Sequence, residues 1–218
     1  MIVAIDGPAG AGKSSVARGV AAALGFTYLD TGALYRTIAL AALQQGIAPS
    51  DGPALGALAG ATAIELDGVR VLMDGRDVSE RIRDADVTEL VSVISAHPAV
   101  RSALLLHQQH AASSGDIVIE GRDIGTAVAP DAAVKVFLTA SPEERARRRA
   151  AQLGLPMDAD TLKELAEDLA ARDRADETRA SSPLTRAADA IEMDTTDMTQ
   201  EEVIAAIVEL TRRAAPRG

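Results

Sequence analysis

The sequence contains no cysteine and very few aromatic residues. Among its 218 residues none is Cys, and only 2% are Phe, Trp or Tyr. Without cysteine the chain cannot form disulfides, thiolate metal sites or a cysteine nucleophile, which agrees with a reducing cytoplasm. Few aromatic side chains also leave few platforms on which the bases of single-stranded nucleic acid could stack.

Long apolar runs and an excess of positive charge are absent as well. No run approaches the roughly 20 apolar residues that cross a bilayer, and the start of the chain lacks the basic and apolar segments of a signal peptide. The formal net charge of -10 argues against general binding to a nucleic-acid backbone. We therefore expect a soluble, cytoplasmic protein, monomeric, that binds neither membranes nor nucleic acids.

The few lysines are offset by many arginines. Of the 22 basic residues only Lys13, Lys135 and Lys163 are lysines, so 19 are arginines. Because arginine grips a phosphate through two parallel hydrogen bonds, clusters of it on an acidic protein predict a small phosphorylated ligand. At this length the chain can bury a sizeable core as one domain.

The most informative motif lies between a short apolar strand at residues 2–6 and an alanine-rich helix that ends near Leu24. Residues 7–14 match G-x-x-x-x-G-K-[ST] without a gap, a loop whose backbone N–H groups cradle a polyphosphate. Lys13 would reach the β- and γ-phosphates and Ser14 would offer a hydroxyl to Mg²⁺. The predicted ATP-binding residues are Gly7, Pro8, Ala9, Gly10, Ala11, Gly12, Lys13, Ser14 and Ser15.

Strands and helices alternate along most of the chain, which predicts an α/β fold. We expect a doubly wound, five-stranded parallel P-loop sheet with helices on both faces and ligands at the carboxyl edge. Residues 63–78 instead alternate apolar and polar side chains around two Asp-Gly pairs, the pattern of an antiparallel meander. A parallel sheet cannot incorporate such a meander, so residues of about 63–96 are predicted to form an inserted lobe.

Several arginines occur where such a fold would bind its ligand. Arg36 lies one turn into a predicted helix that follows the second strand. Ser141 begins another helix as part of a predicted capping box with Glu144, and on that helix Arg148 and Arg149 share a face with Arg145. In a helix predicted for about 161–176, Arg172, Asp176 and Arg179 would share a face if the helix extends that far.

Four segments together resemble the bacterial cytidylate kinases, a family of P-loop kinases for nucleoside monophosphates. They are residues 5–14, the run Asp-Thr-Gly-Ala-Leu-Tyr-Arg at 30–36, the run Glu-Gly-Arg-Asp-Ile-Gly-Thr at 120–126, and the Arg-Asp pair at 172 leading to Arg179. The resemblance covers essentially the whole chain. It implies transfer of the γ-phosphoryl group of ATP to CMP or dCMP, with Mg²⁺.

The resemblance also implies a set of site residues. Arg36, Arg122 and Arg179 would hold the acceptor phosphate, Ser92, Arg101 and Asp123 would read the cytosine, Arg172 and Asp176 would meet the sugar, and Thr31 and Tyr35 would complete the acceptor site. Lys13, Arg148 and Arg149 would supply catalytic counter-charge. Asp123 has a physical rationale, because a carboxylate accepts from the 4-amino group of cytosine and repels the carbonyl oxygen of uracil.

The same resemblance divides the chain into a core at 1–62, 97–152 and 171–218, the monophosphate-binding lobe at about 63–96, and a lid at about 153–170. The structural alternative to base recognition is a helix-capping hydroxyl for Ser92 and a surface arginine for Arg101. A guanine-reading Asn-Lys-x-Asp segment is missing, so a GTP-hydrolysing switch is excluded. The remaining alternatives are a kinase for another small acceptor, such as a different nucleotide or shikimate, and a regulator that binds ATP without transfer.

Overall fold

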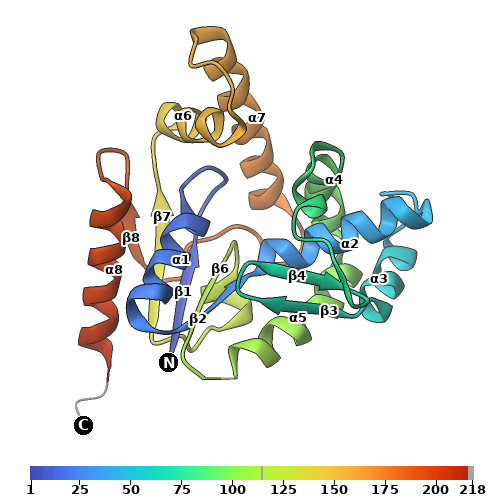
Figure 1. Ribbon diagram of the computed structural model, residues 1–218, viewed down its shortest axis with the longest axis horizontal. Helices are drawn as coiled ribbons and strands as arrows, with labels where there is room; N and C mark the ends of the chain where they lie inside the picture. Colours follow the sequence, from blue (N-terminus) through green and yellow to red (C-terminus); the bar gives the residue numbers. More distant parts are fainter. Residues whose placement is uncertain (114, 216–218) are drawn as a thin grey trace. The chain divides into compact units, whose positions relative to one another are not determined.

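The computed structural model describes residues 1–113 and 115–215 and divides into two compact units (Figure 1). Unit 1 comprises Met1–Tyr28, Gly115–Thr178 and Ser182–Gly218, and unit 2 comprises Leu29–Ser114 and Arg179–Ser181. Each has its own apolar core.

A five-stranded sheet forms the centre of unit 1 and continues into the start of unit 2. The strand order is β2-β6-β1-β7-β8, with β1 at Ile2–Asp6, β2 at Thr27–Asp30, β6 at Ile117–Gly121, β7 at Val134–Thr139 and β8 at Ile191–Asp194. β1 pairs in parallel with β6 and β7, and β7 with β8. Because helices cover the sheet, the central strands are apolar at nearly every position. The predicted parallel P-loop fold is confirmed.

Four helices accompany the sheet in unit 1. They are α1 (Lys13–Leu24), α6 (Pro142–Leu153), α7 (Ala159–Thr178) and α8 (Gln200–Ala214), together with the π-helical turn η2 (Ile124–Val128). α1 packs against α8, and α6 packs against α7 (Figure 1). The predicted capping box at Thr199 and Glu202 is present at the start of α8.

The start of α6 differs in part from the prediction. The Ser141 hydroxyl accepts the N–H of Glu144, as an N-cap does. The Glu144 carboxylate, however, accepts from Arg147 and Arg148 at 2.9 and 3.0 Å. The predicted reciprocal bond is therefore replaced by two arginine contacts, because charged donors one turn away bind a carboxylate more strongly than a neutral N–H does.

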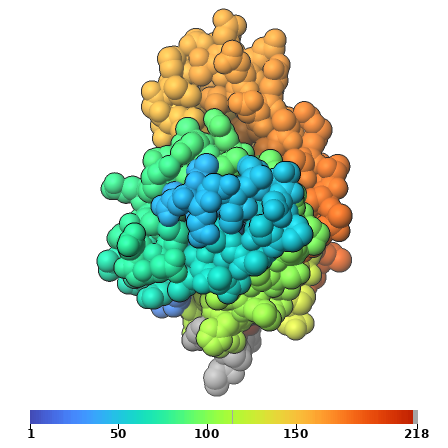
Figure 2. All heavy atoms as spheres, turned by 90° about the vertical axis from the view of Figure 1, so that its right-hand side faces the viewer, coloured from blue at the N-terminus to red at the C-terminus, as the bar shows by residue number. Residues whose placement is uncertain are grey.

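Unit 2 is an α+β unit built around a small antiparallel sheet. It contains α2 (Thr31–Gln45), α3 (Gly52–Ala61), β3 (Ile64–Asp67), β4 (Arg70–Met73), β5 (Arg76–Asp77), η1 (Arg81–Arg83), α4 (Ala85–Ala96) and α5 (Pro98–Ala112). The three strands pair in the order β3-β4-β5, so the predicted meander is confirmed. Figure 2 shows one face of this unit, where light-blue atoms near α3 lie beside the blue-green atoms of the small sheet.

The core of unit 2 extends further along the chain than the lobe predicted for 63–96. Ile38 of α2, Leu55 of α3 and Leu104 of α5 are fully buried in one cluster with Ile82 and Ile94. The helices on either side of the meander thus bury their apolar faces against it, and the compact unit has the bounds Leu29–Ser114. The helix after the second strand was predicted, but no local pattern indicated which sheet it would cover.

Among the described residues, no single helix has the length and apolar composition of a membrane span. The pair α4 and α5 meets both criteria only when taken together, and it is bent by 96° at its break.

Candidate functional site

The loop that joins β1 to α1 has the backbone conformation of an anion cradle. Gly7, Gly10 and Gly12 have φ angles of 147°, 77° and 84°, which residues with a Cβ rarely adopt. A Cβ at Gly7 would lie 2.1 Å from the carbonyl oxygen of Leu138. The loop therefore requires glycine both for its conformation and for its close approach to β7.

Lys13, the first residue of α1, is buried inside this site. Its side chain is 7% exposed, and Nζ donates to the carbonyl oxygen of Pro8 at 2.7 Å. Burial lowers the pKa of Lys13, and the positive charge of Arg122 lowers it further, whereas Glu120 opposes the shift. A polyphosphate would supply the negative charge that this group of cations lacks.

Ser14 lies next to a buried carboxylate that comes from a different part of the sequence. Its hydroxyl donates to Oε2 of Glu120 at 2.9 Å, and the hydroxyl of Tyr28 donates to Oε1 of the same residue. Glu120 is 3% exposed at the end of β6. A hydroxyl and a carboxylate are the hard oxygen ligands that Mg²⁺ prefers, so the residues present fit the expected ion. The described residues contain no cluster of three or more His, Asp or Glu that would form a complete protein cage.

Asp6, the last residue of β1, holds the segment that carries Asp123. Its two carboxylate oxygens accept the N–H groups of Ile124 and Gly125, each at 2.8 Å. Burial, with a smaller contribution from the charge of Asp123, raises the pKa of Asp6 to about 6, although the two backbone hydrogen bonds and Lys13 oppose the shift. Asp123 itself is 5% exposed. Two buried carboxyl groups therefore share this edge of the sheet.

Two of the predicted acceptor-binding residues are in contact between the end of β6 and α7. Nε of Arg122 donates to Oδ2 of Asp176 at 2.9 Å. Arg172 lies one turn earlier on α7, and its charge, like that of Arg122, lowers the pKa of Lys13. The structure thus brings these acceptor residues into the electrostatic field of the phosphate loop.

The condition under which Arg179 would share a helical face with Arg172 and Asp176, a helix that extends as far as Arg179, is not met. α7 ends at Thr178, and the chain then turns so that the N–H of Leu184 donates to the carbonyl of Asp176. Ser182 in this turn has a φ of 47°. Arg179, the first residue after the helix, groups with unit 2.

The other predicted residues belong to unit 2. Thr31, Tyr35 and Arg36 lie on the first turns of α2, whose N-cap is Asp30. Arg36 and Arg83 lie 3.8 and 3.7 Å from Oδ2 of Asp30. The contact of Arg83 with Asp30 was not predicted, because no pattern in the polar sequence after the meander indicates it.

Arg101 on α5 is buried, which excludes the alternative of a surface arginine. It is 6% exposed, its guanidinium carbon lies 5.4 Å from the ring centre of Tyr35, and Nη1 donates to the carbonyl of Ser95 at 3.3 Å. Ser92 is half-buried on α4, one turn before Ser95. Arg101 and Tyr35 therefore form a cation–π pair inside unit 2.

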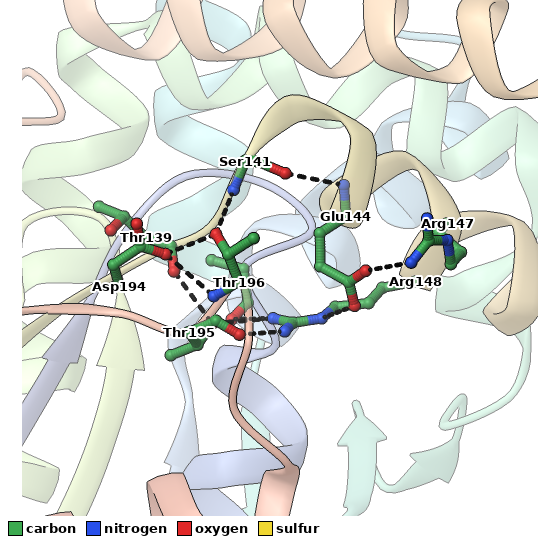
Figure 3. Close-up of polar contacts among 9 residues, drawn as sticks. Thr139, Ser141, Glu144, Arg147, Arg148, Asp194, Thr195 and Thr196 are labelled. Atoms are coloured by element: carbon green, nitrogen blue, oxygen red, sulfur yellow. Dashed lines mark hydrogen bonds and ion pairs between the residues drawn. The ribbon is translucent and has the colours of Figure 1, made fainter.

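The three arginines predicted to share a face on α6 have different partners. Arg145 is buried and pairs with Asp173 of α7, and Arg149 donates to Gln152 at 2.9 Å. Arg148 donates to Oγ1 and the carbonyl oxygen of Thr195 at 2.9 and 2.6 Å (Figure 3). Its Nη1 lies 3.4 Å from the carbonyl of Ala11, so this cation borders the phosphate loop.

Sequence reasoning did not include Asp6 or Asp173 among the binding residues, and it connected Glu120 with the metal only through the family resemblance. Asp6 and Glu120 are acidic residues at the carboxyl ends of apolar strands, and in parallel sheets these ends share one edge, so their pattern could have indicated them. Asp173 follows Arg172 on a highly charged helix, where its burial depends on tertiary packing alone.

Comparison with known proteins identifies the family of this chain. The family model described as Cytidylate kinase matches residues 3–213. Cytidylate kinase of Mycobacterium leprae is 50% identical over 98% of this chain and 96% of its own length. The cytidylate kinases of Pelotomaculum thermopropionicum and Shouchella clausii are 48% and 50% identical over 94% and 96% of this chain, and 93% and 95% of their own lengths. A solved gluconokinase from Sinorhizobium meliloti is only 17% identical over 97% of this chain and 92% of its own, with a TM-score of 0.49. The identities to the three named kinases, over nearly their whole length, show that this chain belongs to the cytidylate kinase family.

Proposed function

We propose that this protein transfers the γ-phosphoryl group of ATP to CMP or dCMP and releases ADP with CDP or dCDP. The observation that supports it most is the glycine loop with buried Lys13 and the Ser14–Glu120 pair, in a chain about half identical to named cytidylate kinases. A polyphosphate donor is the ligand that such a loop binds.

On the donor side, the backbone of residues 7–15 surrounds the phosphates of ATP. Lys13 leaves its bond with Pro8 and places its charge on the β- and γ-phosphates. Ser14 and Glu120 hold Mg²⁺, which when bound neutralises charge on the transferring group. Arg148 and Arg149 of α6 add further positive charge beside the loop.

On the acceptor side, we assign three arginines to the acceptor phosphate: Arg36, Arg122 and Arg179. Arg172 and Asp176 bind the sugar, Asp123 with Ser92 and Arg101 reads the base, and Thr31 and Tyr35 support them. We assign residues of about 63–96 to a monophosphate-binding lobe and about 153–170 to a lid that excludes water when the substrates are bound.

The chemistry requires no general base. The second ionisation of a nucleoside monophosphate has a pKa of about 6, so its attacking oxygen is already largely ionised at neutral pH. The protein's task is to position two polyanions in line and to neutralise their charge. The substrates are small molecules, and we propose a cytoplasmic monomer.

An ATP-consumption assay across several acceptors tests this function directly. We expect turnover with CMP and dCMP, and kcat/KM for UMP, AMP and shikimate lower by at least about 100-fold, since unpaired polar groups in a binding site are strongly rejected. Preferred turnover of another acceptor, or ATP binding with no transfer to any of them, would overturn the proposal.

The base-reading role of Asp123 has its own test. Asp123→Ala is expected to lower the CMP:UMP ratio of kcat/KM by at least about tenfold, because the carboxylate that discriminates against the uracil oxygen is gone. The exposed Asp131, eight residues further along the chain, provides the matched control Asp131→Ala. An unchanged ratio in Asp123→Ala would remove this residue from base recognition.

A further inference from the structure

Ala9, at the tip of the phosphate loop, is held from outside by two helices. Its N–H donates to Oδ1 of Asp173 on α7 at 2.9 Å, and its carbonyl oxygen accepts from Nη1 of Arg145 on α6 at 3.0 Å. The same Nη1 contacts Oδ2 of Asp173. The three residues form a closed ring of hydrogen bonds, although they lie far apart in the sequence.

The ring is buried, and its charges balance each other. Arg145 is 9% exposed and Asp173 is 6% exposed. A carboxylate this close to a polyphosphate site would repel the ligand if it were uncompensated, but the paired guanidinium cancels its charge. The pair therefore presents hydrogen-bonding groups to the loop without adding net charge to the donor site.

Gly10 packs the next part of the loop against the same helices. Its φ is 77°, and a Cβ there would lie 3.1 Å from Cβ of Arg145, 3.2 Å from the carbonyl oxygen of Arg145 and 3.4 Å from Cδ1 of Leu169. The loop backbone is thus in direct contact with both helices at the position where the ring closes.

The ring fixes the orientation of two successive peptide groups. Because a trans peptide directs its N–H opposite to its C=O, and the structure contains no cis peptide bond among the described residues, anchoring the carbonyl of Ala9 on Arg145 directs the N–H of Gly10 away from α6. The N–H of Ala9 is held by Asp173. Neither peptide group can rotate without breaking a buried hydrogen bond.

We infer that Arg145 and Asp173 are positioning residues for the donor: they keep the backbone of the phosphate loop in the conformation that binds the phosphates of ATP. This role rests on the proposed function only in the choice of ATP as the ligand. Neither side chain needs to touch a phosphate. Arg145 and Asp173 affect the affinity for ATP and leave the affinity for the acceptor unchanged. The predicted lid at 153–170 lies between these two residues in the sequence, so a residue on each side of that segment contacts the loop.

The decisive variant replaces both charges by apolar residues. The double variant Arg145→Met with Asp173→Leu removes every hydrogen bond to Ala9 but leaves the net charge unchanged, and replacing a buried ion pair in this way is often neutral for stability. We expect a denaturation midpoint close to that of the wild type. The affinity for ATP and for tripolyphosphate, measured by calorimetry without acceptor, should fall at least about tenfold, because a misplaced site loses much of its binding.

Two comparisons separate positioning from charge and from general destabilisation. Asp173→Asn keeps an oxygen that can accept the N–H of Ala9 but removes a negative charge; a purely electrostatic role predicts tighter ATP binding, whereas the positioning role predicts binding no tighter than that of the wild type. Ile82→Val, buried in unit 2, is the destabilised control and should bind ATP normally.

Steady-state kinetics provide the second readout. In the double variant KM for ATP should rise while KM for CMP stays within about twofold, a split that general loss of structure would not produce. A double variant that is as stable as the wild type and binds tripolyphosphate equally well would overturn the inference. Since binding is measured without acceptor, that result is distinct from a failure of the wild type to phosphorylate CMP, which would instead refute the proposed function.

Discussion

In unit 1 the charged side chains around the phosphate loop are held by short hydrogen bonds from buried partners, whereas in unit 2 the predicted phosphate-binding arginine Arg36 is held by a longer ion pair. Nη1 of Arg145 lies 3.0 Å from the carbonyl oxygen of Ala9 in the phosphate loop, but Arg36 lies 3.8 Å from Asp30, beyond hydrogen-bond distance. Short buried bonds fix a geometry before the ligand arrives. A longer, half-buried contact costs less to break, so Arg36 is able to turn toward an incoming phosphate.

This difference suggests that the two substrates are bound in different ways. The donor meets a preorganised backbone, whose conformation depends on glycines and on buried carboxylates. In the proposed function, Arg36 of α2 would exchange its ion pair with Asp30 for the acceptor phosphate. Variants of Lys13 and of Arg36 should therefore affect different kinetic constants.

The largest effect is expected for Lys13→Ala in unit 1. Loss of the cation that neutralises the transferring phosphoryl group should lower kcat by about 10³-fold, while the affinity for CMP, measured by calorimetry, stays within about twofold of the wild type because the acceptor residues are intact. The exposed Arg212 on α8 provides the control Arg212→Ala. A kcat within about tenfold of the wild type would remove Lys13 from the mechanism.

A smaller effect, confined to the acceptor, is expected for Arg36→Met in unit 2. A hydrogen bond to a charged group contributes about 1.5–3 kcal/mol, so kcat/KM for CMP should fall by about 10- to 100-fold while ATP affinity is unchanged. Arg70→Met, at an exposed arginine that pairs with Asp77, is the matched control. Equal losses for ATP and CMP would contradict the assignment of Arg36 to the acceptor.

The smallest effect concerns stability and arises from Asp6. Its pKa in the folded protein is about 6, above the ordinary value of 3.8. Between these two pH values the folded state therefore keeps a proton on Asp6 that the unfolded state releases. The contribution of this group to stability is complete below about pH 4 and is lost as the pH rises through 6. Relative to Asp6→Asn, the free energy of unfolding of the wild type should fall by about 1–2 kcal/mol between pH 5 and 7.5.

Chemical denaturation at several pH values measures this difference. Ile207→Val, a buried substitution on α8 that cannot titrate, should differ from the wild type by a constant amount across the same range. A constant difference for Asp6→Asn as well would show that the Asp6 carboxyl is not perturbed by its burial.

Much of unit 1 could be predicted because its signals are local. Residues 2–13 contain the apolar run, the glycines that follow it and the start of α1 at Lys13. The capping box at Thr199 is likewise specified by a few consecutive residues. The antiparallel strands of unit 2 were predicted for the same reason, since their Asp-Gly turns determine the register. In each case a short segment contains all the residues that stabilise it.

Other features could not be predicted because they depend on packing or on a choice between competing partners. The extent of unit 2 depends on which apolar faces pack against its small sheet, and after the end of α7 the N–H of Leu184 bonds back to Asp176. Glu144 accepts from Arg147 and Arg148 on its own helix in place of the predicted backbone bond, and the capping motif alone does not decide between these local donors.

The sequence by itself therefore determined the phosphate loop, the class of the fold and the family, because the loop motif and the order of the elements are local properties of the chain. Only the tertiary structure decided how the loop is held. Glu120 reaches Ser14, Asp6 reaches the segment after β6, and Arg145 with Asp173 encloses Ala9. The partners in these contacts lie more than 100 residues apart, and burial gives their charges an influence that their positions in the sequence do not reveal.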